Sequence, residues 1–250
     1  MPPRTELRPG AAAAAGSAIS AILLAGGRGS RLGGVDKALL RRGAQTQIER
    51  WIQELQGRDI ATVVVGPPAL EPLIPGSVPL VREAPGFAGP AAGVLAGAAA
   101  LQRLGPDPES VGSAGSAKSE GAGAVPTRWT LLLAVDLTEP AALLDWLLGE
   151  LEKPDVEKTH SEKLDVDAPI AVLPRDASGR QQYLSSAVPT DWLLGRVAAL
   201  SPSEAEDRPL RWLLQGLEEA ATLRRPVAPP EVSEDVDTLH DAQRLGMRLP

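Results

Sequence analysis

The chain has 250 residues and a formal net charge of −7, and 43% of its residues are hydrophobic. This length supports one domain with a substantial core, and the excess of 32 acidic over 25 basic residues argues against a nucleic-acid partner, which would require a basic surface. The absence of Cys and the presence of only two His exclude disulfide scaffolds and thiolate metal sites and disfavour a histidine-based zinc site, so we expect oxygen ligands for any metal.

Residues 1–17 are rich in Ala, Pro and Gly, and this composition predicts a disordered leader. The leader has no compact apolar stretch before a cleavage site, so it does not resemble a secretory signal. Apolar runs elsewhere are shorter than the roughly 20 residues of a membrane-spanning helix. We therefore expect a cytoplasmic protein with no membrane partner, whose single domain occupies residues 18–250.

The first predicted element is a buried strand over Ile19–Ala25, which is followed at once by glycine. The run Leu24–Lys37 (LAGGRGSRLGGVDK) holds five Gly together with the cations Arg28, Arg31 and Lys37. Glycines let backbone N–H groups approach phosphate oxygens closely, and Arg and Lys bind phosphate through charge and hydrogen bonds. Loops at the carboxyl ends of strands form the ligand crevice of open α/β sheets. The pattern therefore predicts a triphosphate-binding loop.

Two better-known glycine loops do not match this run. The P-loop requires Gly, four residues and then Gly-Lys-Ser/Thr, and no such run occurs. In the dinucleotide-binding pattern Gly-x-Gly-x-x-Gly, Gly27 and Gly29 fit the first two positions, but the third falls at Leu32. A solvated, flexible surface loop is the remaining alternative. The ordered spacing of glycines and cations favours a phosphate site.

Strand and helix patterns alternate along the rest of the chain. Thr46 and Glu49 have the spacing of a capping box, which predicts a helix start at this point. The expected elements after the first strand are a helix over 46–55, strands at 60–65 and 80–81, a helix over 90–104, a strand at 129–135, a helix over 140–151, a strand at 170–173 and helices over 188–200 and 210–223. This alternation predicts a doubly wound α/β fold.

Two polar stretches, residues 105–126 and 153–167, interrupt the alternation. They have too few apolar side chains to offset the entropy cost of ordering the chain. We expect both to be flexible insertions between elements of the domain.

Acidic residues stand after the expected strand at 129–135 and before a last helix that begins near Thr238. Asp136 ends the apolar strand, so its carboxylate should face the same edge as the glycine loop, where it could bind Mg²⁺ that bridges phosphate oxygens. Capping of the next helix is the alternative role. Asp235 and Asp237 flank Val236, so in an extended segment both would point to one side and could reach one cation. We favour Asp237 of the two, the alternative being a cap for a helix that begins near Thr238.

The segment Leu24–Lys37 closely resembles the opening motif of the molybdenum cofactor guanylyltransferases, a branch of the nucleotidyltransferases. Further segments look like the same family and follow in the expected order: Gly89–Gly93, Asp136, Asp235–Thr238 and Gly179–Leu184, the last resembling the acceptor-side segment. The resemblance covers residues 18–245 with gaps. It implies a single domain with a Rossmann-like, three-layer, doubly wound fold, in which the sheet is mostly parallel.

The resemblance also implies an activity, which is transfer of GMP from GTP to the phosphate of molybdopterin with Mg²⁺ as cofactor. It implies that Arg31 and Lys37 are catalytic and that Asp136 and Asp237 hold the metal. The implied nucleotide-binding residues are Leu24, Ala25, Gly26, Gly27, Arg28, Gly29, Ser30, Lys37, Gly89, Gly93 and Asp136, and the implied acceptor-binding residues are Arg180, Gln182 and Tyr183. GTP and molybdopterin are then the small-molecule partners, and contact with proteins of molybdenum cofactor biosynthesis or with molybdoenzymes is compatible with this activity.

The sequence departs from better-known members at three positions. Gly66 stands where they carry Asn, the acidic residue expected before the Gly-Pro loop falls near Glu83 or Ala84, and Val135 replaces a Cys or small polar residue. These changes weaken the expectation of guanine specificity more than that of nucleotidyl transfer. The alternatives are cytidylyl transfer, guanylyl transfer to phospholactate for a deazaflavin cofactor, and a catalytically idle nucleotide-binding protein.

Overall fold

The computed structural model describes residues 19–27, 32–104, 127–154 and 169–250. The predicted leader, the predicted insertion at 105–126 and all but the first two residues of the one at 153–167 lie outside these ranges. Two sheets are formed by β1 (Ile19–Leu24), β2 (Arg41–Arg42), β3 (Gln45–Thr46), β4 (Ala61–Val65), β5 (Leu80–Val81), β6 (Trp129–Ala134), β7 (Ile170–Val172), β8 (Ser185–Pro189) and β9 (Thr222–Arg224). The helices are α1 (Gln47–Gln56), α2 (Pro90–Leu104), α3 (Pro140–Glu152), α4 (Thr190–Ala198), α5 (Pro202–Ala205), α6 (Leu210–Leu213), α7 (Leu217–Ala220), α8 (Pro230–Ser233) and α9 (Leu239–Arg244), with 3-10 turns at Lys37–Leu39 and Pro68–Leu73.

The main sheet has seven strands in the order β5-β4-β1-β6-β8-β7-β9. The central strand β1 is parallel to both β4 and β6, with Leu24 in register with Val65 on one side and Ala134 on the other. Strand β8 runs antiparallel to both of its neighbours, and the other pairings in this sheet are parallel. The predicted mostly parallel α/β sheet is therefore confirmed. Its order reverses beside β1, and the carboxyl ends of β1, β4 and β6 meet at one edge.

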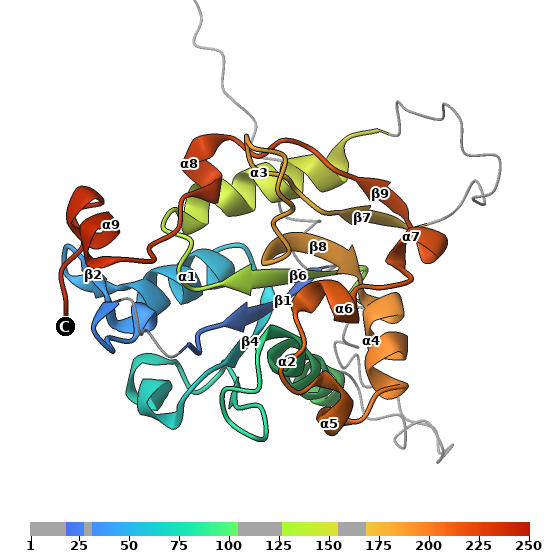
Figure 1. The fold of residues 1–250 in the computed structure, drawn as a ribbon, viewed down its shortest axis with the longest axis horizontal. Helices are drawn as coiled ribbons and strands as arrows, with labels where there is room; N and C mark the ends of the chain where they lie inside the picture. The colour runs from blue at the N-terminus through green and yellow to red at the C-terminus, as the bar shows by residue number, and fades with distance from the viewer. Residues whose placement is uncertain (1–18, 28–31, 105–126, 155–168) are drawn as a thin grey trace, which may run out of the picture.

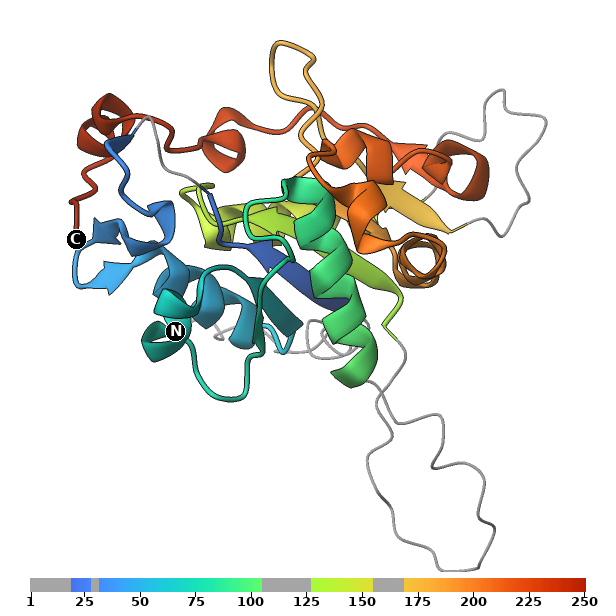
Figure 2. The same ribbon diagram turned by 60° about the horizontal axis from the view of Figure 1, so that its bottom comes forward.

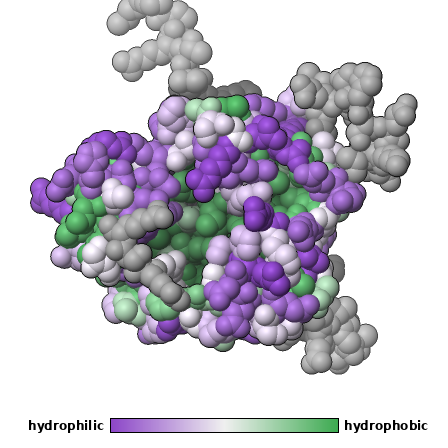
Figure 3. All heavy atoms as spheres, viewed as in Figure 1, coloured by the Kyte–Doolittle hydropathy of each residue, from purple (hydrophilic) through white to green (hydrophobic). Residues whose placement is uncertain are grey.

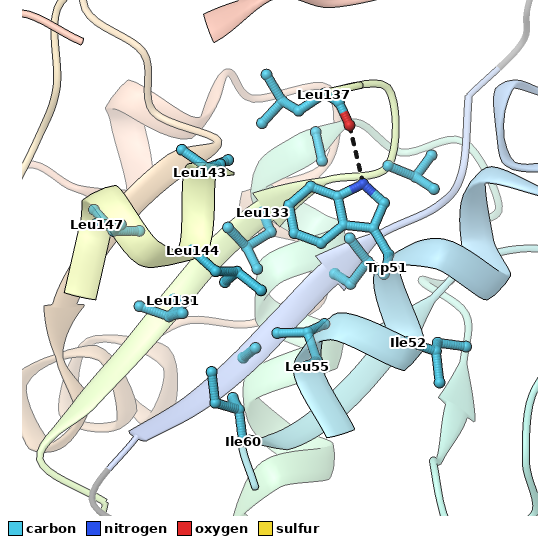
Figure 4. Close-up of a cluster of buried hydrophobic side chains, with 14 of the residues drawn as sticks. Trp51, Ile52, Leu55, Ile60, Leu131, Leu133, Leu137, Leu143, Leu144 and Leu147 are labelled. Carbon is cyan, nitrogen blue, oxygen red and sulfur yellow. Dashed lines mark hydrogen bonds between the residues drawn. The ribbon is translucent and has the colours of Figure 1, made fainter. Parts of the chain in front are cut away.

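Helices cover both faces of the sheet, which gives three layers (Figures 1 and 2). Successive side chains of a strand alternate between faces, so Leu23 packs with α1 and α3 on one face while Ile22 packs with α2 and α4 on the other. Figure 4 shows the first cluster, in which Trp51 fits against the sheet and its indole N–H donates to the Leu137 carbonyl at 3.1 Å. Among the helices in the described ranges, none is both long and apolar enough to span a bilayer.

The elements predicted up to residue 173 agree with the structure to within one residue at each end. The capping box of Thr46 and Glu49 also forms as predicted. Two later predictions were wrong. The helix expected over 188–200 starts at Thr190, because Val188 and Pro189 complete β8, a strand that was not predicted. The helix expected over 210–223 is divided into α6, α7 and β9, with Gly216 in the left-handed conformation, φ 86°, between the two helices.

Candidate functional site

A cavity of about 280 Å³ opens where β1, β4 and β6 end. It is lined by the residues that follow β1 and β6, by the end of β4, by the loop that leads into α2 and by Lys37. Figure 3 shows an apolar hollow on this face, over the region where β1 and β6 end. The cavity therefore lies at the sheet edge and strand-order reversal at which open α/β sheets bind ligands.

Three charged side chains meet at one side of this cavity. The Lys37 Nζ atom donates to Asp136 Oδ2 at 2.8 Å and to Asp237 Oδ1 at 2.5 Å. Burial alone would lower the pKa of Lys37, but the charges and hydrogen bonds of the two carboxylates outweigh burial and raise the pKa. Lys37 therefore stays protonated at neutral pH, with only 22% of its side chain exposed.

Local structure fixes the position of Lys37. It opens a 3-10 turn whose N-cap is Asp36, and the Asp36 carboxylate accepts the Ala38 N–H at 2.9 Å. Burial raises the pKa of Asp36, and this hydrogen bond opposes the rise. The role of Asp36 is thus to hold the turn, and its carboxylate does not bond to the Lys37 ammonium.

Asp136 is positioned by the turn that follows β6. The carbonyl of the next residue, Leu137, accepts hydrogen bonds from the side chains of Gln47 at 2.7 Å and Trp51 at 3.1 Å, which attach this turn to α1. Helix α3 has Glu139 at its N-cap, with no side-chain capping bond. Helix capping is therefore not the role of Asp136, whose carboxylate bonds to Lys37.

Asp237 reaches the site because its segment pairs with the turn after β6. Val236 N–H donates to the Asp136 carbonyl at 3.1 Å, and Leu137 and Asp235 form an antiparallel bridge. The alternative role of helix cap belongs to Thr238, whose side chain accepts from Asp241 N at the start of α9. Burial, followed by the nearby carboxylates of Asp237 and Asp136, raises the pKa of Asp235.

A small third core connects this segment to the glycine-rich loop. Leu32 is 1% exposed and packs in a cluster with Leu40, Val236, Ala242 and Met247. One cluster thus holds the end of the loop that leads to Lys37 and the segment that carries Asp237.

The pair of Asp136 and Asp237 suits a magnesium ion. Both carboxylates approach a single nitrogen atom, so both lie within reach of one cation. Mg²⁺ commonly takes one or two carboxylates and completes its shell with phosphate oxygens and water. No cluster of three or more acidic, His or Cys side chains suited to a metal occurs in the described ranges.

The predicted nucleotide-binding residues fall into two groups. Leu24, Ala25, Gly26, Gly27, Lys37, Gly89, Gly93 and Asp136 all line the cavity. Arg28, Gly29, Ser30 and Arg31 lie outside the described residues. Two backbone groups near the cavity are already used within the sheet, because the Ala25 N–H donates to Val65 O at 2.8 Å and the Leu24 carbonyl accepts from Val135 N at 2.9 Å.

Glycines allow α2 to approach β1 closely beside the cavity. A Cβ at Gly93 would lie 3.2 Å from Leu24 Cδ2, and one at Gly97 would lie 2.5 Å from Ile22 Cγ2. Gly89 has φ +90°, a conformation that disfavours any side chain. The glycines of this loop and helix are therefore required by backbone geometry and packing.

The predicted acceptor-binding side chains do not line the cavity. Gln182 Nε2 donates to Asp176 Oδ2 at 2.9 Å, and the Arg180 N–H donates to Asp176 Oδ1 at 3.0 Å, so both residues belong to a hairpin turn organised by Asp176. Tyr183 packs against the hydrophobic cluster under α2 and α4. Only the next residue, Leu184, reaches the cavity among the members of the Gly179–Leu184 segment.

Eight of the residues that line the cavity were absent from the predicted site, and two of them are of particular interest. Glu83 and Phe87 both border the cavity, and the Glu83 carboxylate accepts the Phe87 N–H at 2.8 Å. For Glu83 the sequence did hold a signal, because an acidic residue was expected near Glu83 or Ala84. For Phe87 the signal was an aromatic side chain two positions before Gly89 in a chain with only one Phe.

Comparisons with known proteins agree with this architecture. The family profile of the MobA-like NTP transferase domain matches residues 21–221. A molybdenum cofactor guanylyltransferase of Acidiphilium cryptum (strain JF-5) is 40% identical over 85 residues, which are 33% of this chain and only 42% of that relative's length. Among solved structures, the Mycobacterium sp. strain JC1 homologue of Mycobacterium tuberculosis rv0371c has a TM-score of 0.56 at 19% identity, covering 92% of this chain and 95% of that one. A cytidylyltransferase of Leptospira borgpetersenii has a TM-score of 0.53 at 13% identity, with 91% and 84% covered.

Proposed function

This chain belongs to the family of MobA-like NTP transferase domains, and from that premise we propose that it transfers GMP from GTP to the phosphate of molybdopterin. The observation that carries the proposal is the convergence of Lys37, Asp136 and Asp237 beside a cavity at the ends of β1 and β6. The partial match to a molybdenum cofactor guanylyltransferase supports the choice of base and acceptor.

In the proposed reaction an acceptor phosphate oxygen attacks the α-phosphorus of GTP. A new phosphorus–oxygen bond forms, and the bond from the α-phosphorus to the oxygen that bridges it to the β-phosphorus breaks, so that pyrophosphate leaves with the electron pair. The acceptor phosphate is already anionic at neutral pH, so no strong general base is needed. Catalysis then depends on the positioning of the reactants and on the neutralisation of charge.

We assign charge neutralisation to Lys37, whose raised pKa keeps it cationic. Its ammonium would move from the carboxylates to the phosphate oxygens as charge develops on them. Asp136 and Asp237 would hold Mg²⁺, which when bound withdraws charge from the phosphates and the leaving pyrophosphate. Arg31 is assigned the same role as Lys37.

Nucleotide binding is assigned to the two loops that border the cavity. Leu24 and Ala25 would contact the base together with the Gly89–Gly93 loop. The phosphates would be bound by Gly26, Gly27, Arg28, Gly29 and Ser30. We retain Arg180, Gln182 and Tyr183 as acceptor contacts. None of these three side chains lines the cavity, so they would meet only a part of the acceptor that extends out of it.

One observation favours a second candidate, which is transfer of another nucleotide such as CMP. A Cβ at Gly66 would lie 3.0 Å from Leu70 Cδ1 and 3.4 Å from Ala25 Cβ. Packing therefore opposes the Asn side chain that better-known relatives carry at this position, and the nucleotide loses one polar contact. Guanylyl transfer to phospholactate and nucleotide binding without catalysis complete the set of candidate functions.

Pyrophosphate release by the purified full chain tests the proposal. The assay uses Mg²⁺ and each of GTP, CTP, ATP and UTP, with and without molybdopterin. Release that requires GTP and molybdopterin together supports guanylyl transfer, and release with CTP supports the second candidate. If no pyrophosphate is released with any of the four nucleotides and molybdopterin, despite tight Mg²⁺-dependent GTP binding, the acceptor is phospholactate or the protein is catalytically idle. Addition of phospholactate separates these two outcomes.

A further inference from the structure

Phe87, at the edge of the cavity, has an exposed side chain and a strained backbone conformation. It is 43% exposed, although a large apolar side chain is normally more stable when buried. Its φ is +65°, a left-handed conformation that is an outlier for a bulky residue. Backbone outliers of this kind cluster at ligand sites, where the surrounding structure holds them in place.

The neighbouring residues hold the Phe87 ring before any ligand binds. The Arg82 guanidinium lies over the ring, 5.3 Å from its centroid. Gly86 makes this possible, because any Cβ there would collide with the guanidinium. The Glu83 carboxylate accepts the Phe87 N–H at 2.8 Å. Phe87 lines the cavity, whereas Arg82 does not.

The next residues fix the loop from the other direction. Asp207 N–H donates to the Ala88 carbonyl at 2.7 Å, and Ala91 N–H donates to the Arg208 carbonyl at 3.3 Å. The segment between α5 and α6 therefore clamps the backbone on the carboxyl side of Phe87. The backbone is therefore held on both sides of Phe87.

The sheet order sets the position of Phe87 relative to the charged groups. Phe87 belongs to the connection between β5 and α2, whereas Asp136 follows β6. Strands β5 and β6 lie on opposite sides of β1. A ligand that lies across the end of β1 would thus place an anionic end beside Asp136 and Lys37 and a planar, apolar end beside Phe87.

We propose that Phe87 is a stacking platform for the base of the nucleoside triphosphate. The inference rests on the proposed function, because it takes the cavity to be a nucleotide site. Stacking on an aromatic ring suits any base, and the cation–π contact with Arg82 strengthens the platform. The ring supplies affinity for the base, while hydrogen-bonding groups of the cavity provide the choice among bases.

Binding to the full chain, measured by calorimetry without acceptor, tests this proposal. Two ligands are compared. The affinity for GTP depends on contacts to both the base and the phosphates, whereas the affinity for inorganic tripolyphosphate depends on contacts to the phosphates alone. Phe87→Leu keeps an apolar side chain of similar size on the same left-handed backbone but removes the aromatic ring. We expect it to weaken GTP binding by about tenfold or more, in keeping with base stacking elsewhere, and to leave tripolyphosphate binding unchanged. Phe87→Tyr, which keeps an aromatic ring, should bind GTP as tightly as the wild type.

Phe87→Gly separates the ring from the backbone, because it removes the ring and relieves the left-handed strain. It should lose GTP affinity as Phe87→Leu does. Unchanged GTP binding in Phe87→Leu, or equal losses for GTP and tripolyphosphate, would overturn the stacking role. In a separate titration with molybdopterin, a loss confined to molybdopterin binding would also overturn it, since the ring would then serve the acceptor. Wild-type protein that binds no nucleoside triphosphate would instead overturn the proposed function itself.

Discussion

The ammonium of Lys37 lies 2.8 Å from a carboxylate oxygen of Asp136, although 99 residues separate the two in the chain. Parallel pairing of β1 with β6 causes this approach, since Leu24 and Ala134 are in register and both strands end at one edge. Asp237 then joins from a segment that pairs with the turn after β6. The sheet thus assembles the charged side of the cavity from three distant segments.

Lys37→Met should reduce kcat/KM for pyrophosphate release by about 10²- to 10³-fold, the usual cost of losing one group that stabilises transition-state charge. Met has a similar length without the charge, so circular dichroism should show an unchanged fold. Lys153→Met is the matched control, because Lys153 pairs with Glu150, away from the cavity lining, and its side chain is 60% exposed. Full activity of Lys37→Met would contradict the assignment.

Asp136→Asn and Asp237→Asn should weaken metal binding. Even a partner outside the first ligand shell commonly contributes about 10- to 100-fold in metal affinity, so we expect at least a tenfold rise in the Mn²⁺ dissociation constant of the GTP-bound protein, measured by electron paramagnetic resonance. Asp145→Asn, which removes an exposed carboxylate paired with Arg58, should bind Mn²⁺ normally. Equal affinity in all three variants would exclude Asp136 and Asp237 as ligands.

Thr46→Ala should lower the free energy of unfolding by about 1 kcal/mol, the typical value of an N-cap. The backbone and side-chain hydrogen bonds from Thr46 lower the pKa of Glu49 below its ordinary value. A carboxylate with a depressed folded pKa stabilises the protein above its unfolded pKa, and this stability is lost as the pH falls through the folded value. Glu49→Gln should therefore be less stable than wild type at pH 7, and urea denaturation should show the difference disappearing at acid pH.

Gly97→Ala should destabilise the protein by about 1–3 kcal/mol, the usual cost of overpacking a core. The new methyl would lie 2.5 Å from Ile22 Cγ2 and 3.0 Å from Val65 Cγ2. Gly149→Ala is the matched control in α3, where nothing lies within 4 Å of the added Cβ, and helix propensity alone should stabilise it by up to about 1 kcal/mol. Thermal denaturation should give a lower melting temperature for Gly97→Ala and a higher one for Gly149→Ala. This result would confirm that Gly97 sets the distance between α2 and β1.

Local signals along the chain predicted most of the architecture. Helices α1 and α3 carry apolar side chains at helical spacing, and β1, β4 and β6 are short apolar runs, so period and composition are enough to identify them. Strand β8 escaped prediction because it begins with Ser185 and Ser186, which are buried polar residues. Their hydroxyl groups donate to the carbonyls of Gln182 and Tyr183, a compensation that no local pattern reveals.

The sequence by itself determined the glycine-rich run after β1, the acidic residues that follow β6 and precede α9, and the alternation of strands and helices that predicts an α/β fold, because each depends on residues near one another in the chain. Only the tertiary structure decided that Lys37 would hold Asp136 and Asp237 together, that Arg180, Gln182 and Tyr183 would stay out of the cavity lining, and that Phe87 would border the cavity. Strand order and the packing of remote segments control these contacts. Local periodicity carries no information on which strands become neighbours.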